Sequence, residues 1–182
     1  MWLFPALTIW LLPCVSVTIF SRNKDVNCLT TELKEFYAED YTGAEVKAIF
    51  NKVYGGTGLN EGGNSEIQVG MLVVFGEMDW EKGWTQQFHY GAIRNNNSKM
   101  FKLLGPDTGF DSIGEFTTAK AMAKFLDRLN SNGKLTKTIL YNLNPCANEV
   151  IATMLGNFQD GTVAGKIQFG SVGGSYSTRP SP

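Results

Sequence analysis

The stretch GWTQQFHYG, residues 83–91, decides the fold of this chain. From Trp84 onward it is rich in aromatic residues and ends at Gly91, which is typical of a strand. Before it, apolar residues recur at helical spacing over residues 67–78, and after it a second such run spans residues 117–131. A strand between two amphipathic helices predicts one unit of a parallel βαβ sheet.

The same alternation continues toward the C-terminus. Residues 137–143 form the next predicted strand, and residues 166–169 form another. Between them, Asn144-Pro145 supplies a cap and a first-turn proline for a helix that runs to about residue 157. Apolar residues form the predicted buried stripe of the helix at 117–131 (Ala121, Met122, Phe125, Leu126 and Leu129). The fold class is therefore α/β with parallel βαβ units.

Two further segments complete the predicted organisation. Thr42 and Glu45 form a capping box at the start of a helix that ends at Gly55-Gly56, and a Gly/Asn-rich linker follows through Asn64. Residues 94–112 are predicted to form a long polar loop. Ordered loops of this length in compact domains are often functional.

The composition excludes several classes of protein. With 16 Lys and Arg against 17 Asp and Glu, the net charge is -1 and the basic residues are scattered, so we expect neither nucleic acid nor a membrane surface as a partner. Three cysteines without CxxC spacing predict free thiols rather than a disulfide framework. The single histidine, His89, means that these 182 residues alone cannot build a histidine-rich metal site.

Five blocks of sequence resemble, in order and spacing, the signature segments of the uronate isomerases. They are residues 83–97 (GWTQQFHYGAIRNNN), 104–114 (LGPDTGFDSIG), 137–145 (KTILYNLNP), 156–161 (GNFQDG) and 166–171 (KIQFGS). The resemblance implies a partial TIM-type (β/α) barrel of the amidohydrolase type over residues 37–171. It also implies the interconversion of the sugar acids D-glucuronate and D-fructuronate, and of D-galacturonate and D-tagaturonate, in glucuronate catabolism.

The resemblance also implies one divalent metal ion, such as zinc, at the C-terminal mouth of the barrel. Its ligands in the family are a His-x-His pair, a His after a middle strand and a C-terminal Asp. Only the middle ligand has a counterpart, His89, whose alternative is a structural role. We therefore expect a truncated, inactive fragment that does not retain the metal. The alternative is a non-catalytic remnant or an interaction partner of another chain.

Other polar residues near the strand ends are candidates for contacts with substrate. Arg94 is suited to clamp the carboxylate of a uronate, and the alternatives are an ion pair that docks a helix or a solvated side chain in the loop. Asn142 and Asn144 are candidates for binding sugar hydroxyls, although a helix cap is the simpler interpretation of Asn144. We interpret Asp107 and Asp111 as turn residues rather than as a catalytic pair of carboxylates.

The two ends of the chain carry no such resemblance. Residues 1–36 begin with an apolar stretch that contains two prolines and follows no Lys or Arg. We interpret this segment as an aberrant start and expect a cytoplasmic protein, with a signal or membrane anchor as the alternative. Residues 172–182 are interpreted as a tail frameshifted near Ser171. One permitted codon choice for them, read from its third base, encodes the Trp-containing run ending in Asp-Gln with which the family continues.

Overall fold

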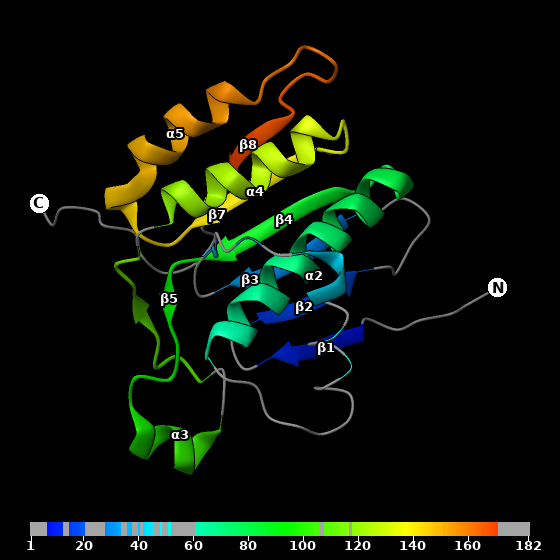
Figure 1. Cartoon of the computed structure of the whole chain (residues 1–182). Helices are drawn as coiled ribbons and strands as arrows, with labels where there is room; N and C mark the ends of the chain where they lie inside the picture. Colours follow the sequence, from blue (N-terminus) through cyan, green and yellow to red (C-terminus); the bar gives the residue numbers. More distant parts are fainter. Residues whose placement is uncertain are drawn as a thin grey trace, which may run out of the picture.

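The computed structural model describes residues 7–12, 15–20, 28–33, 36–37, 40, 42–45, 48, 51, 61–105, 108–116 and 118–170. Six strands in these ranges form one sheet in the order β1-β2-β3-β4-β7-β8, and β5 pairs separately with β6 (Figure 1). The strands are β1 (Leu7–Leu12), β2 (Val15–Phe20), β3 (Cys28–Leu33), β4 (Thr85–Tyr90), β5 (Ala92–Ile93), β6 (Ser112–Ile113), β7 (Thr138–Asn142) and β8 (Ile167–Gly170). The helices are α2 (Glu61–Lys82), α3 (Ser98–Leu104), α4 (Ala119–Ser131) and α5 (Asn148–Asn157), with a 3-10 turn η1 (Pro145–Ala147) directly before α5.

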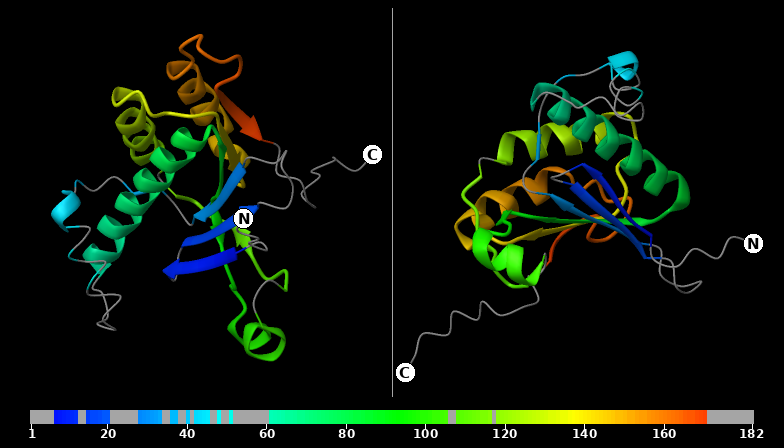
Figure 2. Two further views of the ribbon diagram at one scale, coloured as in Figure 1. Left: turned by 90° about the vertical axis from the view of Figure 1, so that its right-hand side faces the viewer. Right: turned by 90° about the horizontal axis from the view of Figure 1, so that it is seen from below.

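Strands β3, β4, β7 and β8 are parallel neighbours, which confirms the predicted parallel βαβ arrangement. Helix α4 connects β4 to β7, and α5 connects β7 to β8. Figures 1 and 2 show α2, α4 and α5 on one side of the sheet. This is the layering of part of a β/α barrel, in which helices cover the outer face of a parallel sheet.

The apolar N-terminal stretch contributes two strands that the sequence interpretation did not include. Strands β1 and β2 pair antiparallel, and β2 pairs antiparallel with β3. The stretch is rich in β-branched residues, and such side chains fit a pleated sheet well. Among the helices that the structure describes, none is both long enough and apolar enough to cross a bilayer.

The core lies between the sheet and its helices. Phe88 and Tyr90 of β4 are buried on the helix side, and Leu140, the register partner of Phe88 on β7, is fully buried. The stripe predicted on α4 is confirmed, since all five of its residues are buried. Phe36 packs edge-on against Phe88 and Tyr90, with ring centroids 5.5 and 5.4 Å away. These aromatic contacts attach the segment after β3 to the core.

Three predicted segments differ in detail from the structure. The linker expected through Asn64 is shorter, because α2 already begins at Glu61. The polar loop at 94–112 contains α3 and one strand of the β5–β6 pair, and the side chain of Asn97 caps α3 by accepting a hydrogen bond from the Met100 N–H (3.1 Å). The helix expected after β7 is divided into η1 and α5.

The capping box predicted for the first helix is present. The N–H and the hydroxyl of Thr42 both donate to one carboxylate oxygen of Glu45, at 2.7 and 2.8 Å, and the Glu45 N–H donates to the Thr42 hydroxyl at 3.3 Å. Residues 43–45, 48 and 51 are helical. The predicted end of this helix at Gly55-Gly56 lies outside the described residues.

Candidate functional site at the carboxyl ends of the parallel strands

Side chains of β4 alternate between the two faces of the sheet. Gln86, Phe88 and Tyr90 are buried toward the helices, whereas Gln87 and His89 are half-buried on the opposite face. The alternation follows from the two-residue period of a strand. His89 is the last residue but one of β4, so its imidazole lies near the carboxyl end of the strand, on the face that becomes the interior of a β/α barrel.

Tyr141 of the neighbouring strand packs flat against the imidazole of His89. The two residues are partners in the parallel register of β4 and β7, and their rings stack with centroids 4.2 Å apart and planes 7° apart. Gly170 of β8 leaves room for the phenol ring, because a Cβ at this position would lie 2.3 Å from Tyr141 Cε1. Among the described residues, no group hydrogen-bonds to the imidazole, so its nitrogens are available to a ligand.

The electrostatic surroundings favour a neutral imidazole. Burial lowers the pKa of His89, the carboxylate of Glu32 opposes this shift, and the guanidinium of Arg94 adds to it. Glu32 is the register partner of His89 across β3 and β4. Only a neutral imidazole has a lone pair for a metal ion or a proton, so His89 is presented as an electron-pair donor.

Arg94 reaches this site because the chain turns sharply after β4. Gly91 has a φ of 92°, a left-handed conformation that suits glycine, and its carbonyl accepts a hydrogen bond from the Gly114 N–H at 2.7 Å. Strand β5 follows directly and pairs with β6. Arg94 is the next residue after β5, and it lies close enough to His89 to influence the pKa of the imidazole.

Among the described residues, the guanidinium of Arg94 forms ion pairs with two carboxylates. Its Nη1 donates to Asp111 Oδ2 and its Nη2 donates to Glu32 Oε2, each at 2.8 Å. The structure contains an ion pair of Arg94, but its partners lie on β3 and in the loop before β6 and not on a helix, so it is not the helix-docking pair that the sequence left open. The side chain is still 45% exposed, so a ligand can approach it. Its role in binding a substrate carboxylate stays a prediction.

Asp111 does more than the turn formation that the sequence analysis assigned to it. Its second oxygen, Oδ1, accepts a hydrogen bond from the Asn95 N–H at 2.8 Å. Asn95 has a φ of 54°, a conformation that few non-glycine residues adopt, and the carboxylate supports it. The turn interpretation of Asp111 was therefore incomplete. Asp107 lies outside the described residues.

Asn142 and Asn144 stabilise the turn after β7. Asn142 is buried on the helix side of the sheet, and its amide donates to the Asn144 carbonyl and to Asn148 Oδ1 (3.2 Å). The side chain of Asn144 accepts a hydrogen bond from the Cys146 N–H at 3.0 Å, which confirms its interpretation as a cap. The structure therefore does not bring Asn142 to the face that carries His89. The role of both asparagines in binding sugar hydroxyls stays a prediction.

The described residues do not form a complete metal site. Within them, no three side chains of His, Cys, Asp or Glu converge to hold an ion. His89 has the chemistry of one ligand, since it is neutral, half-buried and placed at the carboxyl end of a strand. Zinc sites in proteins use three or four ligands, so one imidazole holds a divalent ion only weakly. Of the ligands that a divalent metal ion needs, the described residues therefore offer one, the imidazole of His89.

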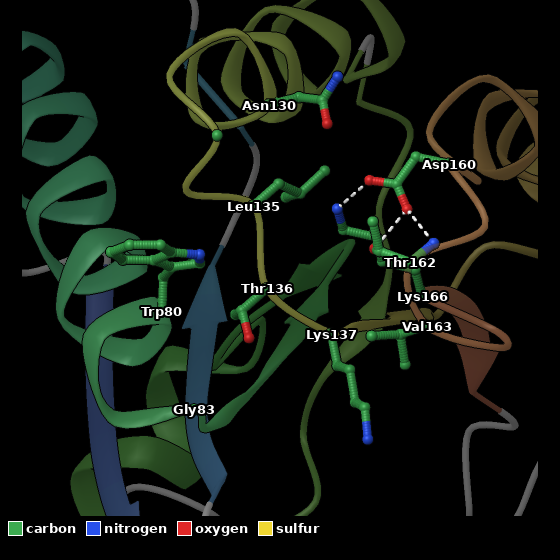
Figure 3. A pocket seen from close by; sticks show the side chains of 11 residues that line it. Trp80, Gly83, Asn130, Leu135, Thr136, Lys137, Asp160, Thr162, Val163 and Lys166 are labelled. Carbon is green, nitrogen blue, oxygen red and sulfur yellow. Dashed lines mark hydrogen bonds and ion pairs between the residues drawn. The ribbon is translucent and has the colours of Figure 1, made fainter.

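A separate pocket of about 530 Å³ lies at the opposite, amino-terminal ends of β4, β7 and β8 (Figure 3). Within it, hydrogen bonds from Lys166 and then Thr162 hold the pKa of Asp160 well below its ordinary value. The charges of Lys166 and Asp160 are thus satisfied by each other. Neither His89 nor Arg94 lines this pocket, so it is not part of the candidate site.

Fold and site together define the class of protein. A parallel sheet with helices on one face, and polar side chains following the carboxyl end of a central strand, is the arrangement at the catalytic mouth of β/α barrels. The chain thus forms part of such a barrel.

The chain belongs to the glucuronate isomerase family, whose family model matches residues 18–173. The matched range begins within residues 1–36, for which the sequence analysis stated no resemblance. The uronate isomerase of Bacteroides thetaiotaomicron is 84% identical to this chain over 139 residues, and that of Cellvibrio japonicus is 59% identical over 139 residues. Each match covers 76% of this chain and 30% of the relative, so the chain spans about 30% of the length of these curated relatives.

Two solved structures share the fold of this region. The crystal structure of the uronate isomerase from Thermotoga maritima matches with a TM-score of 0.66 and 29% identity, covering 76% of this chain and 29% of that one. The glucuronate isomerase from Caulobacter crescentus matches with a TM-score of 0.53 and 25% identity, covering 63% of this chain and 23% of that one. The predicted partial TIM-type barrel is confirmed.

Proposed function

We propose that this chain forms part of the active site of a uronate isomerase that acts on D-glucuronate and D-galacturonate. The supporting observation is that His89 and Arg94 lie together at the carboxyl end of β4. They do so in a chain that is 84% identical over 139 residues to a uronate isomerase. The reaction moves a proton between C2 and C1 of the sugar acid and produces the corresponding ketose.

The side chains of this chain take separate roles in the proposal. Arg94 binds the carboxylate of the sugar acid through charge-assisted hydrogen bonds from its planar guanidinium. His89 would contribute one ligand to a divalent metal ion, whose remaining ligands the described residues do not supply as a cluster. Tyr141 keeps the imidazole in one orientation, because the two rings are stacked 4.2 Å apart.

The proposal is tested by restoring the rest of the barrel. In the Bacteroides thetaiotaomicron uronate isomerase, the stretch of 139 matched residues is replaced by the corresponding residues of this chain. Turnover of D-glucuronate, bound metal and thermal melting of the metal-free protein are measured. Parallel measurements are made on the His89→Ala variant of this graft. The 182-residue chain alone, with its single histidine, is expected to be inactive with added zinc or manganese.

We expect His89→Ala to lower turnover by orders of magnitude, since the imidazole would be one of the ligands that hold the metal ion. The free energy of unfolding of the metal-free protein should change by no more than about 1 kcal/mol, as for a substitution outside the packed core. Thr85→Ala is the matched control, because Thr85 is half-buried on the same face of β4 at its amino end. Full turnover and full metal occupancy in His89→Ala would refute the ligand role.

A second candidate function is that of a non-catalytic remnant or partner of another chain. The observation that favours it is the lack of a three-ligand cluster among the described residues. Metal content separates the two functions. A site completed by other segments or by a partner should hold close to one ion per complex, whereas a remnant should hold almost none.

A further inference from the structure

Within the described part of the chain, two carboxylates contact Arg94, and their side chains differ in exposure. The side chain of Asp111 is 25% exposed and that of Glu32 is 47% exposed. Both oxygens of Asp111 have a partner, because Oδ2 accepts from Arg94 Nη1 and Oδ1 accepts from the Asn95 N–H, each at 2.8 Å. Asp111 therefore holds the side chain of one residue and the backbone of the next.

The loop that carries Asp111 is itself fixed by hydrogen bonds. The N–H of Asn96 donates to the Phe110 carbonyl at 2.8 Å, and the side-chain amide of Asn96 donates to the Ile93 carbonyl (3.0 Å) and the Ser112 hydroxyl (2.9 Å). These bonds join the residues on either side of Asp111 to the segment that carries the guanidinium. The carboxylate is thus preorganised to hold the guanidinium in place.

Glu32 approaches the same guanidinium from another element. It lies on β3, in register with His89, and its charge influences the pKa of the imidazole. The side chains of Glu32 and Arg94 are both nearly half exposed, and Glu32 Oε2 lies 2.8 Å from Arg94 Nη2. Ion pairs so open to water contribute little, so a second carboxylate can compete with Glu32 for the guanidinium of Arg94. The carboxylate of Glu32 therefore occupies a position next to His89 at which a carboxylate can bind Arg94.

We propose that Asp111 is the positioning residue that holds Arg94 for a sugar acid, and that Glu32 competes for the place of the sugar acid's carboxylate. This inference rests on the proposed function, since it assigns Arg94 to carboxylate binding. It predicts opposite effects for two carboxylates that touch one side chain. Loss of the Asp111 charge removes the anchor of the guanidinium, whereas loss of the Glu32 charge removes a competitor.

The test uses the whole 182-residue chain and its Asp111→Asn, Glu32→Gln and Ser112→Ala variants. Binding of D-glucuronate is measured by saturation-transfer NMR, with D-glucose as the uncharged control sugar. Hydrogen exchange of the peptide that contains Asn95, measured by mass spectrometry, reports whether the Asp111 anchor is intact. Ser112→Ala is the matched loop control, because it removes a hydrogen bond of the same loop and leaves both carboxylates in place.

We expect Asp111→Asn to weaken the binding of D-glucuronate about tenfold, the effect of losing a charge-assisted anchor. The same variant should speed the exchange at Asn95. Glu32→Gln should strengthen the binding about two- to fivefold, the factor typical of an exposed ion pair, and should leave the exchange unchanged. Ser112→Ala should leave the binding unchanged, and D-glucose should respond to none of the variants.

Weaker binding of D-glucuronate in Glu32→Gln would overturn the inference, as would unchanged exchange at Asn95 in Asp111→Asn. If Asp111→Asn does not fold, the sign of the effect of Glu32→Gln decides, since Glu32 is exposed and its variant keeps the core intact. If no variant binds D-glucuronate, the proposed carboxylate site fails. The exchange at Asn95 then decides alone whether Asp111 is the anchor of this loop.

Discussion

At the scale of single residues, Asp79 is the carboxyl group among the described residues whose charged form is most disfavoured by its surroundings. It lies in the last turn of α2 and is only 3% exposed, and its Oδ2 has no hydrogen-bond partner within the described part of the chain. Burial raises the pKa of Asp79 to about 7, because the charged form loses its hydration without gaining a partner. The carboxyl group is therefore protonated in the folded protein under mildly acidic conditions.

The stability of the protein should consequently fall as the pH rises. Between about pH 4 and pH 7 the unfolded chain releases the Asp79 proton while the folded chain keeps it. The free energy of unfolding therefore falls as the pH rises through this range. The full loss, as much as about 4 kcal/mol, is reached above the folded pKa. Urea unfolding at pH 5, 6, 7 and 8 measures this slope. Asp79→Asn should remove most of it, whereas Glu81→Gln, an exposed carboxylate of the same helix, should retain it. Equal slopes in wild type and Asp79→Asn would contradict this prediction.

Asn144 gives the second prediction at this scale. Its Oδ1 caps η1 through the Cys146 N–H, and its amide donates to the Gly114 carbonyl at 3.1 Å, which joins two strand-end turns. Asn144→Ala should lower the free energy of unfolding by about 1–2 kcal/mol, since a cap and a second hydrogen bond are lost. Denaturant unfolding measures it. Asn157→Ala, an exposed asparagine at the end of α5, should stay within about 0.5 kcal/mol of wild type.

Residues differ in how far the sequence alone predicts their roles, and the difference follows from the range of their contacts. The cap at Asn144 was predictable, because both its partner and the signal, Asn-Pro after an apolar run, are local in the chain. The bond between Asp111 and Arg94 spans 17 residues, and that between Glu32 and Arg94 spans 62. No local pattern contains such pairings. Asp111 was accordingly assigned only to its turn, and Glu32 was not considered as part of the site.

At the scale of elements, two helical glycines have opposite surroundings. Gly76 of α2 faces α4, and a Cβ there would lie 2.6 Å from Leu129 Cδ1. Gly156 of α5 is exposed and has no neighbour within 4 Å of its Cβ position. Gly76→Ala should therefore lower the free energy of unfolding by about 1–3 kcal/mol through overpacking. Gly156→Ala should raise it by about 0.5–1 kcal/mol through helix propensity.

Thermal and denaturant unfolding of both variants measure this difference in sign. The pair controls for the generic effect of alanine on a helix, because both positions carry the same substitution. A stabilised Gly76→Ala variant would mean that α2 and α4 pack less closely in solution than in the structure.

Elements were predictable where the apolar period is regular. The stripe of α4 repeats at helical spacing, and all five of its residues are buried as predicted. Helix α3 was missed because it has no buried residue, so no apolar stripe marks it; its cap at Asn97 is its main local signal. Strand β1 was missed because its apolar residues follow one another with little alternation. Strand β2 was missed although Val15-Ser16-Val17-Thr18-Ile19 does alternate, because it was read as part of the same apolar run.

At the scale of the whole molecule, the sheet is covered unequally. Helices α2, α4 and α5 cover one face (Figure 2). His89 lies on the other face, as the alternating burial along β4 indicates. Among the described strands, β8 has a neighbour on one side only, and its Phe169 is 41% exposed. An edge strand offers unpaired N–H and carbonyl groups, and an exposed aromatic side chain adds apolar area. In a closed barrel such an edge is paired with a further strand.

The prediction at this scale is that the isolated 182-residue chain associates with itself through the β8 edge. Phe169→Lys should weaken the association roughly tenfold or more, because it replaces an exposed aromatic by a charge that opposes strand pairing. Light scattering across a dilution series measures the change. Val163→Lys is the matched control, since Val163 is 37% exposed in the loop before β8 and offers no strand edge. Because Phe169 is partly in solvent, the monomer should keep its melting temperature.

If both lysine variants weakened association equally, general charge repulsion rather than the β8 edge would be responsible. A concentration-independent monomer in the wild type would show that the edge is already satisfied within one chain.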